Sequence, residues 1–203
     1  MTKEHRSALA YGVINAVLLL VVMTIITGVA YPLLVTGISA LFFGDEAKGS
    51  LVYRDGRPVG SSLLGQDFDD PRYFHGRPSA AGDGYDASSS GGSNLGPTNE
   101  ILLSDIAERA ENVREENGLD PAYEIPSDLV TASASGLDPD ISPESAYLQV
   151  ERIATYRGID ASLVRELIAE HSKGRLLGFI GQPRVNVLEL NLALDELTKR
   201  ERP

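Results

Sequence analysis

An uncharged stretch near the amino terminus, from Tyr11 to Phe43, constrains this chain more than any other feature. A helix needs about 20 apolar residues to cross the hydrocarbon core of a bilayer, and this stretch is longer. The apolar region of a cleaved signal peptide, at about 7–15 residues, is much shorter. A buried helix of a soluble protein is the alternative, but such helices rarely stay uncharged over so many turns. The stretch therefore predicts one transmembrane helix, which we place at residues 11–36.

Two residues inside this predicted helix, Gly28 and Pro32, are unusual for a helix that stands alone. Membrane helices tolerate them when neighbouring protein satisfies the backbone groups that they leave free. Small residues also let the backbones of two membrane helices approach closely. Gly28 and Pro32 are therefore candidates for contact with a partner subunit.

The charges on the two sides of the helix predict its orientation. Lys3 and Arg6 precede it, whereas Asp45 and Glu46 follow it. Positively charged flanks tend to stay in the cytoplasm. We therefore expect a single-pass protein of the cell membrane, with a short cytoplasmic segment at residues 1–10 and an extracytoplasmic domain at residues 44–203.

The net charge of that domain limits the classes of partner that it can bind. The chain has a formal net charge of -11, and because its first ten residues contribute +1, the remainder carries -12. A strongly acidic domain disfavours nucleic acid and anionic lipid surfaces as partners. The chain has no cysteine, so the domain folds without disulfides.

Local patterns predict an α+β domain, with a small sheet or hairpin and several helices. Asp55-Gly56 lies between two short apolar runs and is typical of a two-residue hairpin turn. Apolar residues recur at helical spacing over three later segments, and Ser142 followed by Pro143 is a strong helix start. The predicted helices cover residues 98–117, 142–158, 160–174 and 187–199, with a strand and a turn at residues 175–187.

The long loop between residues 65 and 99 is rich in Gly, Ser, Asp and Pro but also contains several aromatic residues. Flexible linkers are poor in aromatic residues, so we expect this loop to be ordered against the domain or against a partner. Aromatic side chains are frequent anchors of interfaces. For Phe74, burial in the domain's own core is the alternative. The interface candidates of the loop are Phe68, Tyr73, Phe74, Gly91, Gly92 and Asn94.

A search for catalytic motifs finds no self-contained active site. None of the four lysines lies in a phosphate-binding loop, and the GGSNLG segment has the wrong glycine spacing for a hydrolase nucleophile. His75 and His171 are too few for a zinc site. Asp67, Asp69 and Asp70 lack the spacing of a calcium loop, which favours an ordinary solvated acidic loop. We expect no bound metal.

Four long segments together resemble one family: GQDFDDPRYFHGRPSA, SSGGSNLGPTN, DLVTASASGLDPDISPESA and GFIGQPRVNVLELNLALD. With the single helix before them, they resemble the C subunit of the Kdp potassium-transporting P-type ATPase. The likeness extends from the predicted helix to about Asp195, which is nearly the whole chain.

The resemblance implies a non-catalytic subunit of a high-affinity ATP-driven potassium uptake pump. Its partners would be a channel-like potassium-binding subunit, an ATP-hydrolysing subunit and a small membrane peptide, within a lipid bilayer. It implies a role in assembly and, as a catalytic chaperone, in raising the ATP affinity of the hydrolysing subunit. ATP is thus expected by resemblance alone, with Gln66 and Gln149 as side chains able to bind an adenine edge.

The charges that flank the predicted helix place the domain outside the cytoplasm, whereas ATP is in the cytoplasm. The predicted orientation therefore conflicts with direct contact between the domain and ATP. From the residues, we therefore favour support of assembly and of potassium access. Two readings from other classes stay open: a membrane-anchored hydrolase, and an extracytoplasmic binding module that is not tied to a pump.

Overall fold

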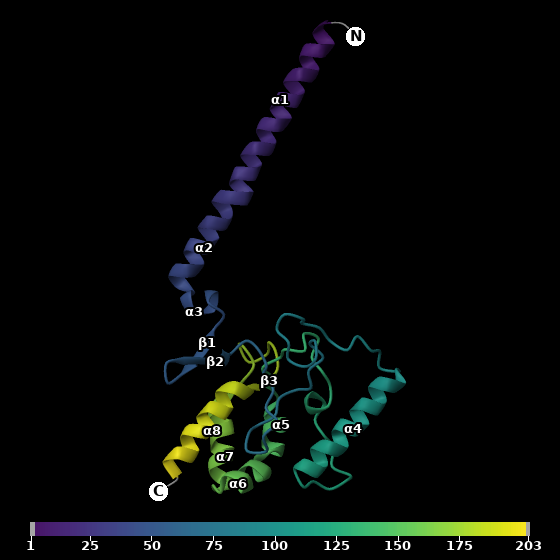
Figure 1. Ribbon diagram of the computed structural model, residues 1–203, viewed down its shortest axis with the longest axis vertical. Helices are drawn as coiled ribbons and strands as arrows, with labels where there is room; N and C mark the ends of the chain where they lie inside the picture. Colours follow the sequence, from purple (N-terminus) through teal and green to yellow (C-terminus); the bar gives the residue numbers. More distant parts are fainter. Residues whose placement is uncertain (1–2, 202–203) are drawn as a thin grey trace. The chain divides into compact units, whose positions relative to one another are not determined.

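The computed structural model describes residues 3–201, with side chains from residue 11 onward (Figure 1). The outer parts of the predicted segments 1–10 and 44–203 lie outside the described residues. The chain divides into two compact units, residues 1–50 and residues 51–203. We describe each unit by itself.

The described part of the first unit is mostly helical. It consists of α1 (Lys3–Ile25), a π-helical segment η1 (Ile26–Ala30), α2 (Tyr31–Phe42) and the short α3 (Gly44–Ala47). Residues Tyr11–Phe42 form a helix of 32 residues that is long and apolar enough to cross a membrane, and none of it is buried within the chain. An apolar helix is present where the span was predicted, and it continues six residues beyond the predicted end at residue 36.

Pro32 accounts for the widened turn in this helix. Proline has no N–H to donate, and its ring collides with the carbonyl four residues earlier, which here belongs to Gly28. The helix accommodates this by a π turn, in which the Tyr31 N–H donates to the carbonyl of Ile26 five residues back. Such π turns are frequent at functional positions in helices.

The second unit begins with the predicted hairpin. Strand β1 (Leu51–Arg54) pairs antiparallel with β2 (Arg57–Ser61). Asp55 and Gly56 have φ angles of 51° and 75°, as a two-residue turn with left-handed central residues requires. A bulge between Val52 and Tyr53 shifts the register of the pair.

The predicted helices are present, with two corrections. They are α4 (Glu100–Glu116), α5 (Pro143–Leu148), α6 (Val150–Arg157), α7 (Ala161–His171) and α8 (Val187–Glu201), and a 3-10 turn η2 (Ser127–Leu129) lies between α4 and α5. Ser142 caps α5, as the predicted helix start at Ser142 and Pro143 requires, and Asp160 caps α7. The helix predicted at residues 142–158 is divided at Gln149, and α7 ends at His171 instead of Gly174, because Ser172–Lys173 form strand β4.

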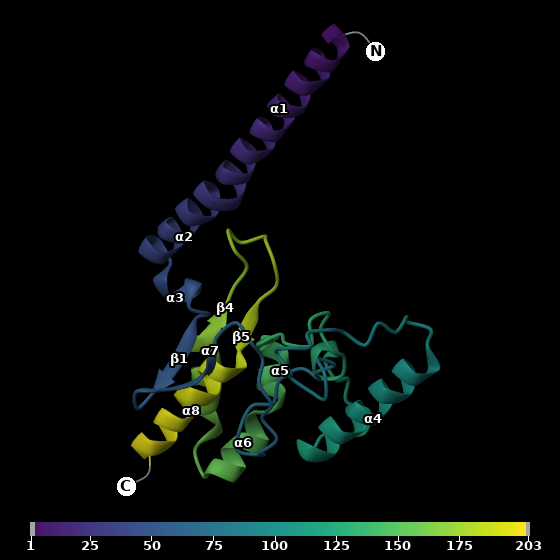
Figure 2. The same ribbon diagram turned by 45° about the horizontal axis from the view of Figure 1, so that its top comes forward.

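A small antiparallel sheet joins segments that are far apart in the sequence. β5 (Arg184–Asn186) lies between β3 (Asp140–Ile141) and β4 (Ser172–Lys173). Helices α5 to α8 gather beside this sheet (Figure 2). The core between them is formed by Phe74, Ile141, Ala146, Val150, Ile153, Ala154, Val164, Leu167, Ile168, Val185, Val187, Leu190 and Leu194. A single apolar helix followed by an α+β domain is the predicted fold class, and it is confirmed.

Candidate functional site

The loop at residues 65–99 contains no helix or strand, yet it is fastened to the domain along its length. Phe74 is completely buried and belongs to the hydrophobic core. The expectation that Phe74 anchors a partner is therefore corrected, because its side chain offers no surface to another protein. Phe68 packs against the same core while remaining partly exposed.

Two buried amide side chains hold the backbone of Phe74 and of the residue that follows it, His75. Asn191 accepts from the Phe74 N–H at 2.8 Å and donates to the Phe74 carbonyl at 3.0 Å. Gln149 does the same for His75, with distances of 2.8 and 3.2 Å. Each amide thus supplies the hydrogen-bond donor and acceptor that the backbone of a neighbouring strand would supply in a sheet. Without these amides, the buried backbone groups of the loop would be left unpaired.

A buried arginine adds a third fastening. The Arg152 side chain is 1% exposed and donates to the carbonyls of Pro71 and Tyr73 at 2.6 and 3.0 Å. It also donates to Gln149 at 2.6 Å and to Asn117, at the end of α4, at 3.0 Å. One guanidinium therefore connects the loop, α4 and α6, and its five donors suit such a junction.

Glu116 supplies the opposite charge for this arginine. Its carboxylate lies 3.6 Å from Arg152 and 3.3 Å from the imidazole of His75. Burial would raise the pKa of Glu116, but the hydrogen bond from His75 and the charge of Arg152 hold this pKa below its ordinary value. Burial lowers the pKa of Arg152, yet an arginine keeps its proton in proteins.

A second cluster fastens the loop to α8. Asp195 accepts from Arg54 at 2.6 Å and from Arg157 at 2.8 Å, and these two bonds hold its pKa below the ordinary value although burial opposes them. Arg157 also lies 4.6 Å above the ring of Tyr73 and donates to the carbonyl of Arg72. Tyr73 in turn contacts Phe68, with 5.8 Å between ring centroids.

The glycine-rich end of the loop lies against residues 133–136. A Cβ at Gly92 would come within 3.1 Å of the carbonyl of Ala134, so only glycine fits this approach without displacement. A Cβ at Gly91 would meet nothing within 4 Å, and Asn94 is exposed with a φ of 53°. Gly91 and Asn94 are therefore on the outer side of the loop, whereas Gly92 has a structural role.

A cavity of about 360 Å³ lies between the loop and α4, lined by both acidic and basic side chains. Burial, followed by the charge of Asp69, raises the pKa of Asp67. Burial raises the pKa of Tyr85 to about 12, so that it stays a phenol and donates to the carbonyl of Arg77. Asp70 is turned to Arg72 and is not among the residues that line the cavity.

The two glutamines predicted to bind adenine are both bonded inside the domain. Gln66 donates to the carbonyl of Val59 at 3.1 Å. Gln149 lines the cavity but is 1% exposed, and its amide accepts two hydrogen bonds and donates two. An amide has no further capacity in this arrangement.

Sequence reasoning missed the residues that do most of the fastening. Asn191 lies four residues after Val187 in α8, and Arg152 lies four residues after Leu148 within the helix that the sequence predicts at residues 142–158. A polar residue in phase with a buried face is a signal of an internal hydrogen-bonded role. Asp195 and Arg157 had no comparable signal.

Comparison with known proteins supplies the identity. The family model "KdpC: K+-transporting ATPase, c chain" matches residues 13–196. A potassium-transporting ATPase KdpC subunit of Gemmatimonas aurantiaca is 56% identical over 184 residues, covering 90% of this chain and 92% of the relative. Proteins with the same name from Mycobacterium tuberculosis and Koribacter versatilis are 55% and 50% identical, covering 96% and 94% of their own lengths. This chain therefore belongs to the KdpC family, the c chain of K+-transporting ATPases.

Proposed function

We propose that this chain is the accessory subunit of an ATP-driven potassium uptake pump, and that it works by assembling and stabilising the complex. The observation that carries the proposal is the family match over residues 13–196, which covers both the apolar helix and the domain. The domain adds support, because its largely buried charged side chains Arg152, Arg157 and Asp195 fasten a long loop and thereby keep it ordered.

The proposed partners are a channel-like potassium-binding subunit, an ATP-hydrolysing subunit and a small membrane peptide. In the bilayer, the widened turn between Gly28 and Pro32 offers a place where another helix can approach closely. In the domain, the outer side of the loop, with Phe68, Tyr73, Gly91 and Asn94, offers a preorganised surface. Because this surface is already ordered, a partner would not pay the entropy of ordering it.

Support of ATP hydrolysis follows from assembly in this proposal. Family resemblance predicts that the chain raises the ATP affinity of the hydrolysing subunit. An adenine that used Gln149 would have to replace four internal hydrogen bonds and open the contact between the loop and α6. We therefore propose that the chain influences ATP through its effect on the complex, without holding the nucleotide on either glutamine.

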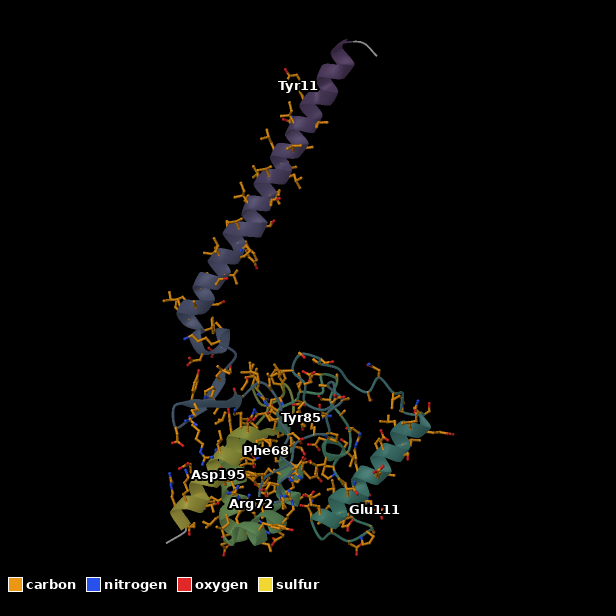
Figure 3. The ribbon with its side chains drawn as sticks, in the orientation of Figure 1. Tyr11, Phe68, Arg72, Tyr85, Glu111 and Asp195 are labelled. Atoms are coloured by element: carbon orange, nitrogen blue, oxygen red, sulfur yellow. The ribbon has the colours of Figure 1, made fainter. Side chains whose placement is uncertain are left out.

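The orientation proposed is a cytoplasmic amino terminus and a domain outside the cell membrane. The chain has no cysteine, so single cysteines report topology without background. Glu111→Cys, on the exposed side of α4 (Figure 3), is expected to react with an impermeant thiol reagent in intact cells. Ser7→Cys, before the span, is expected to react only after lysis. If Ser7→Cys reacted in intact cells and Glu111→Cys reacted only after lysis, the proposed orientation would be wrong. Direct contact between the domain and ATP would then be possible.

The docking surface is tested by Gly91→Arg. A side chain at Gly91 enters open space, so the domain is expected to fold normally, whereas a partner seated on the loop meets a bulky cation. We expect at least about tenfold weaker association with the pump, which corresponds to about 1.4 kcal/mol. Co-purification of the tagged full chain from detergent measures it.

Ala169→Arg, on the exposed side of α7, is the matched control and is expected to assemble normally. Full assembly of the Gly91→Arg variant would place the docking surface elsewhere. A full-length chain that never co-purifies with a pump would favour the stand-alone binding module.

A further inference from the structure

The hairpin-like segment between β4 and β5 presents an unusual group of exposed apolar side chains. Leu176, Leu177, Phe179 and Ile180 are 65%, 77%, 72% and 47% exposed. Across the described part of the α+β domain, no other five consecutive residues contain four exposed large hydrophobic side chains. Exposed apolar groups of this kind mark contacts with membranes or proteins. We refer to residues 175–181 as the apolar tip.

The apolar tip has a defined backbone conformation. Leu176 and Ile180 exchange two backbone hydrogen bonds of 2.9 Å, which closes the turn. Leu177, at the turn, has a φ of 53°, in the left-handed region that a residue with a Cβ rarely adopts. A strained backbone at a leucine that is 77% exposed contributes nothing to the stability of the domain, so it points to a role of the tip outside the domain.

The charge around the tip is opposite to that of the rest of the chain. Residues 172–184 contain Lys173, Arg175 and Arg184 and no acidic residue, although the chain as a whole carries -11. Lys173 pairs with Glu189 on the surface, and Arg184 pairs with the half-buried Asp140. Within the part of the chain whose side chains are described, Arg175 forms no ion pair. An apolar end flanked by basic residues is the composition of a segment that enters the headgroup region of a bilayer.

The tether to the membrane span keeps the domain near the bilayer. Only eight residues, 43–50, separate α2 from β1, and four of them are helical in α3. Even a fully extended chain of eight residues reaches no more than about 28 Å. The domain therefore stays within reach of lipid for as long as the span is inserted.

The apolar tip and the residue at which the tether joins the domain, Leu51, belong to the same part of the domain. Leu51, the first residue of β1, pairs with Ser61, and the next carbonyl, that of Ser62, accepts from Asn186 of β5 at 2.9 Å. β5 is the strand that leads out of the tip. Both ribbon views show the β4–β5 connection on the side of the domain where β1 begins, away from α6 (Figures 1 and 2).

We propose that the apolar tip is a second membrane contact of this chain, which inserts Leu177 and Phe179 into the interface of the bilayer while Arg175 faces anionic lipid headgroups. The span alone leaves the domain free to rotate about its tether. A second contact removes that freedom and presents a fixed face of the domain to neighbouring subunits.

Fluorescence of the full-length chain in vesicles tests the proposal. Leu177→Cys and Phe179→Cys are each labelled with an environment-sensitive nitrobenzoxadiazole dye in the cysteine-free chain. The chain is reconstituted into phosphatidylcholine vesicles containing about one third phosphatidylglycerol. At both positions we expect blue-shifted emission and at least about twofold quenching by lipids with brominated acyl chains. Tyr156→Cys, which replaces a side chain that is 58% exposed on α6, is the control and is expected to show neither effect.

Two results would overturn the proposal. The first is that dyes at positions 177 and 179 show the same emission wavelength and the same weak quenching as the dye at position 156. This result would place the tip in water. Dyes that become shielded only in the assembled pump, without quenching by brominated lipid, would show that a protein subunit covers the tip. The assembly measured with Gly91→Arg is independent of these dyes, so failure here would leave the proposed accessory function untouched.

Discussion

Replacement of Arg152 by leucine is expected to lower the free energy of unfolding of the α+β domain by about 3–5 kcal/mol, because each buried acceptor left without its donor costs about 1–3 kcal/mol. Four acceptors of the loop, α4 and α6 would lose their donor, and Glu116 would lose its opposite charge. For a domain of this size, each kcal/mol changes the melting temperature by about 2–4 °C. A decrease of roughly 10 °C is therefore expected in thermal melts of the full-length chain in detergent, followed by circular dichroism.

The matched control is Arg165→Leu. Arg165 is half exposed on α7 and pairs with the exposed Glu151, and surface pairs of this kind contribute about 0–1 kcal/mol. Its melting temperature is expected to change little. If Arg152→Leu melted like the unmodified chain and failed only to join the pump, Arg152 would have to be an interface residue instead of an internal fastening.

Replacement of Phe74 by alanine is the second change with a large expected effect. Phe74 is completely buried in the core, and truncation of a buried phenylalanine costs about 3–5 kcal/mol of stability. The backbone on both sides of it depends on Asn191 and Gln149, so collapse of the site would also loosen the loop. We expect the melting temperature to decrease by roughly 10 °C and assembly to decrease only as far as the folded fraction does.

Phe179→Ala is the matched control, because Phe179 is 72% exposed and its truncation is expected to change stability by no more than about 0.5 kcal/mol. An unchanged melt of Phe74→Ala, combined with loss of the pump subunits, would contradict the core position and would restore Phe74 as an interface anchor.

The loop at residues 65–99 illustrates how far composition can be trusted. Its aromatic residues correctly indicated order, because such side chains gain free energy only when they are buried. The sequence did not distinguish burial in the domain from burial against a partner. Phe68, Tyr73 and Phe74 lie within seven residues of one another, yet only Phe74 is completely buried. That difference arises from helices that are more than 70 residues away in the sequence.

The sequence by itself determined the features that depend on neighbouring residues. The uncharged stretch at Tyr11–Phe42 predicted an apolar helix long enough to cross a membrane, and the structure contains this helix. Asp55-Gly56 determined a hairpin turn, and Asn99, Ser142 and Asp160 determined where α4, α5 and α7 begin, because turns and caps are formed within a few residues.

Only the tertiary structure decided what depends on distant contacts. The sheet β3-β5-β4 is formed from pieces of two or three residues, which are too short to show a period in the sequence. Gln149 and Arg152 became internal fastenings because the fold brings the loop backbone within hydrogen-bonding distance of α6. A polar side chain is fully buried only where such partners meet it, and those partners are set by the folded chain as a whole.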